Sequence, residues 1–246
     1  MQIILLMGRV IEKNNMDDLH KQKQIEVINS LEQQIKSNSM GFSTVAPVND
    51  YENDTRICLT SVHLPHQQLI TQVQDFLIKP LQQISPGYFF YPSDSLHMTI
   101  KNIRVINDPP HFTEEDTRKS ERVFESVIPR HKKFNVYFYR LLLFPNNLAL
   151  VGTTDPELDS IILDVDKELN KSSVSDDKKY MNSQYFFSNM TLARFNNTPS
   201  GDFLHKVKEL SQSLSFEPYS VDSVTLITCT AVFTKKNIIK TWNLGM

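Results

Sequence analysis

Two short segments of the chain carry side chains that could handle a phosphate group. Residues 97–100 read His-Met-Thr-Ile, and residues 189–192, which lie 92 positions further along, read Asn-Met-Thr-Leu. Side chains alternate between the two faces of a strand, so the first and third residues of each segment are predicted to share a face. Each segment therefore offers a polar pair with apolar residues behind it.

The polar residues of these segments form the candidate site. His97 is the candidate acid or base, because an imidazole can exchange a proton near neutral pH. Thr99 and Thr191 are candidate phosphate ligands through their hydroxyl groups. Lys101 follows Thr99 by two positions, so the strand period predicts that it shares the polar face and contacts the phosphate. The alternative for Lys101 is a solvated charge.

The elements that would position these residues alternate along the chain from residue 55 onward. Strands are predicted at 56–64, 95–106, 133–144, 148–153, 184–195, 223–234 and 238–244, and helices at 66–84, 113–128, 155–170 and 200–214. Several strands are joined by short turns. This pattern favours an α+β fold with antiparallel sheets over a doubly wound parallel sheet.

The first fifth of the chain has a different composition. Residues 15–39 are rich in Gln, Lys and Glu, with a thin apolar stripe at helical spacing, and residues 47–54 have the composition of a linker. We interpret residues 1–50 as a helical appendage and 51–246 as the main domain. The stripe is expected to pack on the main domain, although it could instead serve a purely structural protein as the surface that contacts a partner.

Composition excludes several classes of site. The six glycines are too far apart for a dinucleotide fingerprint or a Walker loop, so any phosphate must be held by side chains. A net charge of −2 argues against a general nucleic-acid coat protein. No segment approaches the 18 apolar residues of a membrane span. We therefore expect a cytoplasmic protein without a membrane partner. A monomer is the expected state, although no feature of the sequence determines it.

The two segments also resemble the motifs of a known family. Residues 96–100 (Leu-His-Met-Thr-Ile) and 190–194 (Met-Thr-Leu-Ala-Arg) are similar to the paired His-x-Thr/Ser-x motifs of the 2H phosphoesterases, which include RNA 2′,3′-cyclic phosphodiesterases and 2′–5′ RNA ligases. The resemblance covers residues 56–244. It implies a bilobal fold in which two antiparallel sheets line a central groove, with helices outside, and a reaction without a metal or another cofactor.

The resemblance also implies roles for the motif residues. In the family one histidine is the general base, the second is the general acid, and the two hydroxyls hold the phosphate. This chain departs from that pattern at Asn189, because an amide cannot exchange a proton in the working pH range. Loss of one partner of an acid–base pair costs on the order of 10²–10⁴ in rate. Arg194 has the opposite parity to Thr191, so it either braces the lobes or turns toward the groove beyond a bulge.

Three interpretations stay open at this point. The chain is a single-histidine phosphodiesterase acting on 2′,3′-cyclic phosphate or 2′–5′ linkages of RNA or nucleotides, or it is a catalytically silent protein that binds a nucleotide or RNA end through its phosphate. In the third interpretation Asn189 is an alteration of an active enzyme.

Overall fold

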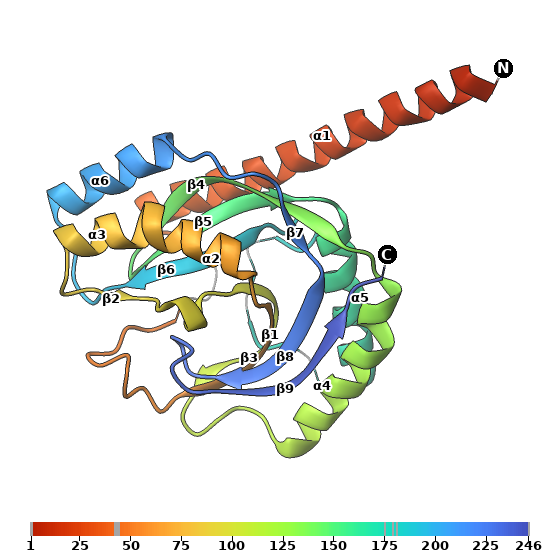
Figure 1. Cartoon of the computed structure of the whole chain (residues 1–246). Helices are drawn as coiled ribbons and strands as arrows, with labels where there is room; N and C mark the ends of the chain where they lie inside the picture. The colour runs from red at the N-terminus through yellow and green to blue at the C-terminus, as the bar shows by residue number, and fades with distance from the viewer. Residues whose placement is uncertain (1, 42–44, 175, 179, 181, 246) are drawn as a thin grey trace.

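Two antiparallel sheets form the centre of the computed structural model, which describes residues 2–41, 45–174, 176–178, 180 and 182–245, with side chains from residue 17 onward (Figure 1). The first sheet has the strand order β3-β1-β8-β9, and the second has the order β2-β6-β5-β4-β7. The strands are β1 (Ile57–His63), β2 (Phe89–Phe90), β3 (Met98–Asn107), β4 (Phe134–Phe144), β5 (Asn147–Thr154), β6 (Ser188–Arg194), β7 (Tyr219–Val221), β8 (Ser223–Cys229) and β9 (Lys236–Asn243). The predicted α+β fold with two antiparallel sheets is confirmed.

Six α-helices are described around these sheets. They are α1 (Gln2–Lys36), α2 (Gln67–Val73), α3 (Lys79–Ile84), α4 (Glu114–Val127), α5 (Glu157–Lys171) and α6 (Gly201–Gln212). Helices α4 and α5 pack on each other and contact the first sheet, whereas α6 contacts β4 of the second sheet and α3. No described helix is long and apolar enough to cross a lipid bilayer.

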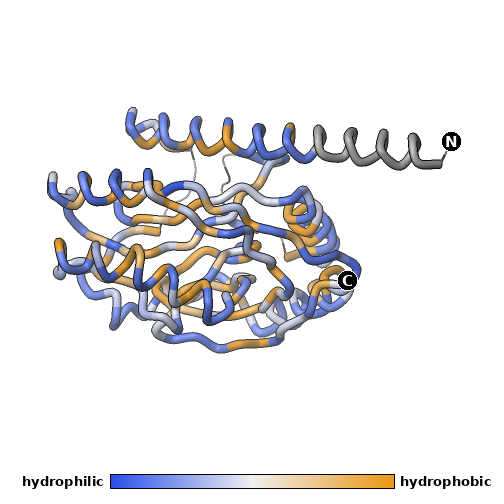
Figure 2. The backbone as a smooth tube through the Cα atoms, turned by 45° about the horizontal axis from the view of Figure 1, so that its top comes forward, coloured by the Kyte–Doolittle hydropathy of each residue, from blue (hydrophilic) through white to orange (hydrophobic). Residues whose placement is uncertain are grey.

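Helix α1 lies on the second sheet, on the face opposite to the one that packs into the main core. Along β5, Leu148 and Leu150 belong to the main core, while Ala149 and Val151 pack against Ile28 and further apolar residues of α1. The predicted apolar stripe is thus partly used, and the described second half of the helix lies along the second sheet (Figures 1 and 2). This packing places the helix beside the second motif strand.

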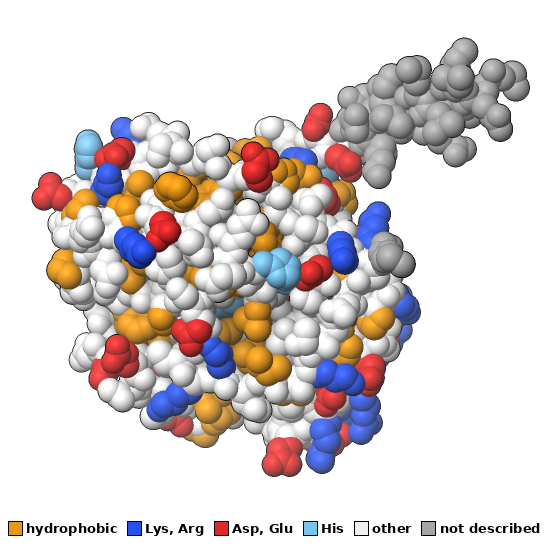
Figure 3. All heavy atoms as spheres, in the orientation of Figure 1, with side chains coloured by type: hydrophobic (Ala, Val, Ile, Leu, Met, Phe, Trp, Pro, Cys, Tyr) orange, Lys and Arg blue, Asp and Glu red, His pale blue; other side chains and the backbone are white. Residues whose placement is uncertain are grey.

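Charged side chains of both signs are interspersed over the face of the molecule that Figure 3 shows. This face has no broad field of one sign, which agrees with the net charge of −2. Affinity for an anionic ligand must therefore come from a local arrangement of side chains rather than from the surface as a whole.

Candidate functional site

Strand β3 carries the first motif and contains a register shift directly after its threonine. Thr99 pairs with Val62 of β1, and Lys101 pairs with the adjacent residue Ser61, so two positions of β3 oppose one position of β1. Such a β-bulge shifts the alternation of side chains by one position. Because Val62 and Ser61 point to opposite faces of the sheet, Thr99 and Lys101 do so as well.

The prediction that Lys101 shares a face with Thr99 is therefore wrong. The Lys101 side chain is only 1% exposed, and its Nζ lies 2.7 Å from Asp166 Oδ1 on α5 and 2.5 Å from Asp176 Oδ2. These two carboxylates neutralise the lysine within the protein. The strand period alone could not reveal this arrangement, because the bulge is set by the pairing of β3 with β1.

Strand β6 carries the second motif and has a register shift at the corresponding place. Thr191 pairs with Ala149 of β5, and Arg194 pairs with Asn147. Since Ala149 and Asn147 are two positions apart, they share a face, and so must Thr191 and Arg194 although three positions separate them. The interpretation that Arg194 turns inward beyond a bulge is correct.

A cavity of about 220 Å³ lies where the two motif strands face each other. The motif residues Thr99, Asn189 and Thr191 line it together with Arg194 and Asn102, the residues that follow each threonine by three positions. Lys101 is not among the lining residues. The structure thus brings together three of the predicted site residues and one arginine from strands that are far apart in the sequence.

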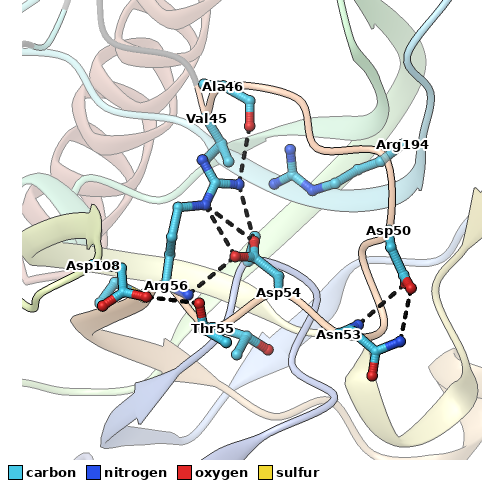
Figure 4. Close-up of polar contacts among 12 residues, drawn as sticks. Val45, Ala46, Asp50, Asn53, Asp54, Thr55, Arg56, Asp108 and Arg194 are labelled. Carbon is cyan, nitrogen blue, oxygen red and sulfur yellow. Dashed lines mark hydrogen bonds and ion pairs between the residues drawn. The ribbon is translucent and has the colours of Figure 1, made fainter.

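Arg194 supplies a positive charge that is incompletely satisfied within the protein. Its side chain is 7% exposed, and its Nε–H donates a hydrogen bond of 2.9 Å to the hydroxyl of Tyr91. Its buried Nη1 has no hydrogen-bond partner among the described residues. Figure 4 shows the guanidinium directed toward the Asp54–Arg56 ion pair and the segment at Val45. A buried donor without a partner costs free energy, which an anion in the cavity would recover.

His97 lies immediately before β3 and is oriented by two contacts. Its Nδ1 is 2.8 Å from the carbonyl oxygen of Ser95, so Nδ1–H donates and Nε2 is left as an acceptor. The ring stacks on Phe233, with centroids 3.6 Å apart and an interplanar angle of 14°. His97 does not itself line the cavity, but its ring also contacts that of Tyr91, the partner of Arg194.

The surroundings of His97 keep it neutral. Burial is the main cause that lowers its pKa to about 4, the nearby cations of Arg194 and Lys236 add to the lowering, and the hydrogen bond to Ser95 opposes it. In the ligand-free protein at pH 7, this imidazole can accept a proton but has none to donate from Nε2. It is suited to be a general base and unsuited to be a general acid.

Helix α1 forms one wall of the cavity. Val27 and Leu31 line it, and Leu31 belongs to an apolar cluster that includes Phe187 beside the second motif. Gln24 is fully buried and anchors the helix, because its Nε2 donates to Thr154 Oγ1 at 2.8 Å and its Oε1 accepts from Thr154 N at 2.8 Å. The segment interpreted as an appendage thus contributes directly to the candidate site.

Three residues that position or complete the site are not among the predicted site residues. Tyr91 lies in an aromatic cluster before the first motif, and its position there is a usable signal. Lys178 lines the cavity from the segment between α5 and β6, and in the sequence it belongs to a small basic patch that is either solvated surface or part of a loop that meets an anionic ligand. Phe233 stands in the turn between β8 and β9 with a positive φ of 63°, and no sequence pattern identifies it.

The comparisons with known proteins support the fold. No protein-family model and no curated protein matches the sequence. The conserved protein of unknown function ATU0111 from Agrobacterium tumefaciens is 13% identical, with a TM-score of 0.58 over 85% of this chain and 97% of that chain. LigT of E. coli, solved in complex with phosphate, is 13% identical, with a TM-score of 0.48 over 78% of this chain and 100% of that chain. The likeness to the Agrobacterium protein shows a shared fold.

Proposed function

We propose that this protein is a phosphodiesterase of the 2H type that acts on 2′,3′-cyclic phosphate or 2′–5′ linkages of RNA or nucleotides. The observation that carries the proposal is the meeting of Thr99, Thr191 and Arg194 in one cavity. Two hydroxyls and a guanidinium with an unpartnered N–H form a site for a phosphate group that needs no glycine-rich loop.

The chemistry of each group assigns its role in this proposal. The hydroxyls of Thr99 and Thr191 hold phosphate oxygens, and Arg194 neutralises the charge that develops on phosphorus oxygens in the transition state. His97 lies outside the cavity lining, beside Tyr91, the hydrogen-bond partner of Arg194, and we assign its Nε2 as the acceptor of the proton of the attacking water. The amide of Asn189 lines the same cavity and can donate a hydrogen bond to a phosphate oxygen, but it transfers no proton.

Hydrolysis of 2′,3′-cyclic AMP by the full chain tests the proposal. We expect turnover by the protein itself, a loss of at least tenfold in kcat/KM for Thr191→Val, and a higher rate for Asn189→His, which restores a second imidazole. Thr198→Ala serves as the matched control, because Thr198 is an exposed threonine outside the cavity. Equal activity of Thr191→Val and the control would contradict the assigned site.

The second candidate function is a catalytically silent binder of phosphate-terminated nucleotides. Asn189 favours it, since the position of the second family histidine holds a group without a pKa in the working range. Binding of the cyclic nucleotide without turnover, both by the protein and by Asn189→His, would establish this alternative. Absence of both binding and turnover would overturn both functions.

A further inference from the structure

Because position 189 holds an asparagine, the site lacks a second histidine to act as the general acid. Cleavage of a cyclic phosphate requires that the departing ribose oxygen, a poor leaving group, receives a proton as its bond to phosphorus breaks. The neutral His97 cannot provide it, because its Nδ1–H is committed to the Ser95 carbonyl and its Nε2 carries no proton. If the protein is catalytic, another side chain in the cavity is needed as the acid.

Four lining residues carry a side-chain N–H or O–H proton. They are Lys178, Tyr180, Tyr185 and Arg194. Arginine remains protonated at any working pH and is therefore no proton donor. Burial raises the pKa of Tyr180, which makes it a weaker acid than an ordinary tyrosine. Lys178 differs from Tyr180 and Arg194, because burial lowers its pKa and makes its proton easier to release.

The position of Lys178 is defined by its neighbours. Its backbone N–H donates to Asp176 Oδ1 at 2.6 Å, while the other oxygen of Asp176 holds Lys101 of β3. The adjacent Asp177 accepts a hydrogen bond of 2.7 Å from the backbone N–H of Val105, also on β3. These contacts tie the segment to the first motif strand, so the Lys178 side chain reaches the cavity from a fixed support.

Burial of the Lys178 ammonium favours release of its proton. Burial lowers the pKa of Lys178, the attraction of Asp176 opposes this, the cation of Lys101 lowers it further, and the thiol of Cys58 on β1 opposes it weakly. The ammonium lies 5.2 Å from the centre of the Tyr180 ring. Among the residues that the structure describes, no carboxylate lies within ion-pair distance of its Nζ, because the carboxylate of Asp176 is paired with Lys101.

We propose that the Lys178 ammonium is the general acid of this site and replaces the second histidine of the 2H motif; this rests on the proposed phosphodiesterase function. Water attacks phosphorus and forms the new P–O bond, while Nε2 of His97 takes the water proton. The bond from phosphorus to the 2′ or 3′ oxygen breaks, and Lys178 gives that oxygen a proton. The products are a phosphomonoester, a protonated His97 and a neutral Lys178, and exchange of one proton through solvent restores the starting state.

Kinetics of Lys178→Arg and Lys178→Met with 2′,3′-cyclic AMP test this assignment. Arginine keeps the positive charge but cannot release its proton, so both variants are expected to lose about 10²–10⁴ in kcat. The alkaline limb of the wild-type pH–rate profile, which reports deprotonation of Lys178, is expected to disappear in both. With a nucleotide p-nitrophenyl ester, whose leaving group departs without a proton, the variants should stay close to wild type.

Controls separate the possible outcomes. Lys167→Arg changes an exposed lysine of α5 and should leave every rate and the pH profile unchanged. An active wild type whose Lys178→Arg variant keeps its rate and its alkaline limb would overturn the role of Lys178 and leave the proposed function intact. An equal loss of activity on both substrates would overturn that role in the same way, because a structural defect acts on both. A wild type that turns over neither substrate would overturn the proposed function and this assignment with it.

Discussion

Both motif strands contain a register shift at the same place, but the shift directs the basic residue of one strand away from the cavity and that of the other into it. In both β3 and β6 the register shifts directly after the motif threonine, so that the residue three positions further on, and not two, returns to the cavity. In β3 the basic residue, Lys101, follows the threonine by two positions and points away from the cavity, and Asn102 lines the cavity instead. In β6 the basic residue, Arg194, follows the threonine by three positions and lines the cavity. A difference of one residue in spacing therefore separates a structural lysine from a candidate phosphate ligand.

The two strands also differ in what surrounds their first motif residue. His97 is held between a carbonyl and an aromatic ring, which fix the nitrogen it presents. Asn189 lies on the strand that α1 covers, in a cavity with an apolar wall. The first strand thus supplies the proton acceptor and the second supplies the charge, so the two halves of the site are not equivalent.

Lys101→Met should have the largest effect, and on stability rather than on binding. The substitution leaves Asp166 and Asp176 without the buried cation, which we expect to cost about 3 kcal/mol of unfolding free energy. Urea denaturation measures the loss, with the exposed Lys167→Met as the control. A Lys101→Met protein of normal stability that fails to bind phosphate would show that Lys101 is a ligand and not a structural residue, which would contradict the difference between the two strands.

Arg194→Met should show the reverse pattern. Loss of a guanidinium that bonds an anionic ligand is expected to weaken affinity for a cyclic nucleotide about a hundredfold, or about 2.7 kcal/mol. Unfolding free energy should change less, because the native protein already leaves one Arg194 donor without a partner among the described residues. Isothermal titration with a non-hydrolysed nucleotide analogue, compared with the exposed Arg130→Met, provides the measurement. Unchanged affinity would contradict the proposal that Arg194 binds the phosphate.

A smaller effect should appear in the pH dependence of stability. The folded pKa of His97, about 4, lies below its ordinary value of 6.5, so between these values only the unfolded chain binds the proton. His97 should therefore reduce stability as the pH falls from about 6.5 toward 4, by on the order of 1 kcal/mol per pH unit. Denaturation curves at pH 7, 6 and 5 should show this slope in wild type and in Asn189→Gln, but not in His97→Gln. Parallel curves for all three proteins would contradict the half-buried, neutral histidine.

Features that depend on residues close together in the chain, such as a helix cap or a hairpin, are predicted correctly from the sequence. The Thr-Glu-Glu-Asp segment predicts a capped helix, and Thr113 and Asp116 form the expected capping box at the start of α4. The strand predicted over 133–144 and its hairpin partner agree closely with β4 and β5, because the alternating residues and the turn lie next to each other in the chain. Pairing of the two motif segments in one site follows from their likeness to each other.

The remaining features depend on contacts between distant segments. The bulges after Thr99 and Thr191 arise from pairing with β1 and β5, and a count of residues along one strand cannot reveal them. The burial of Gln24 is similarly hidden, since its three polar contacts are made with Thr154 and Phe186, more than 100 positions away. Propensity treats a glutamine on a helix as a surface residue, and only the tertiary structure makes it a core residue.

The anchoring of α1 by Gln24 also bears on how the chain can be divided. A protein that began at Tyr51 would keep every strand of both sheets, yet the cavity would lose Val27, Leu31 and Val45 from its lining. The apolar faces of Ala149 and Val151 would at the same time become exposed to water. The boundary that is natural for the sheets is therefore not the boundary of the site, and the smallest unit that retains the site's shape includes the second half of the N-terminal helix.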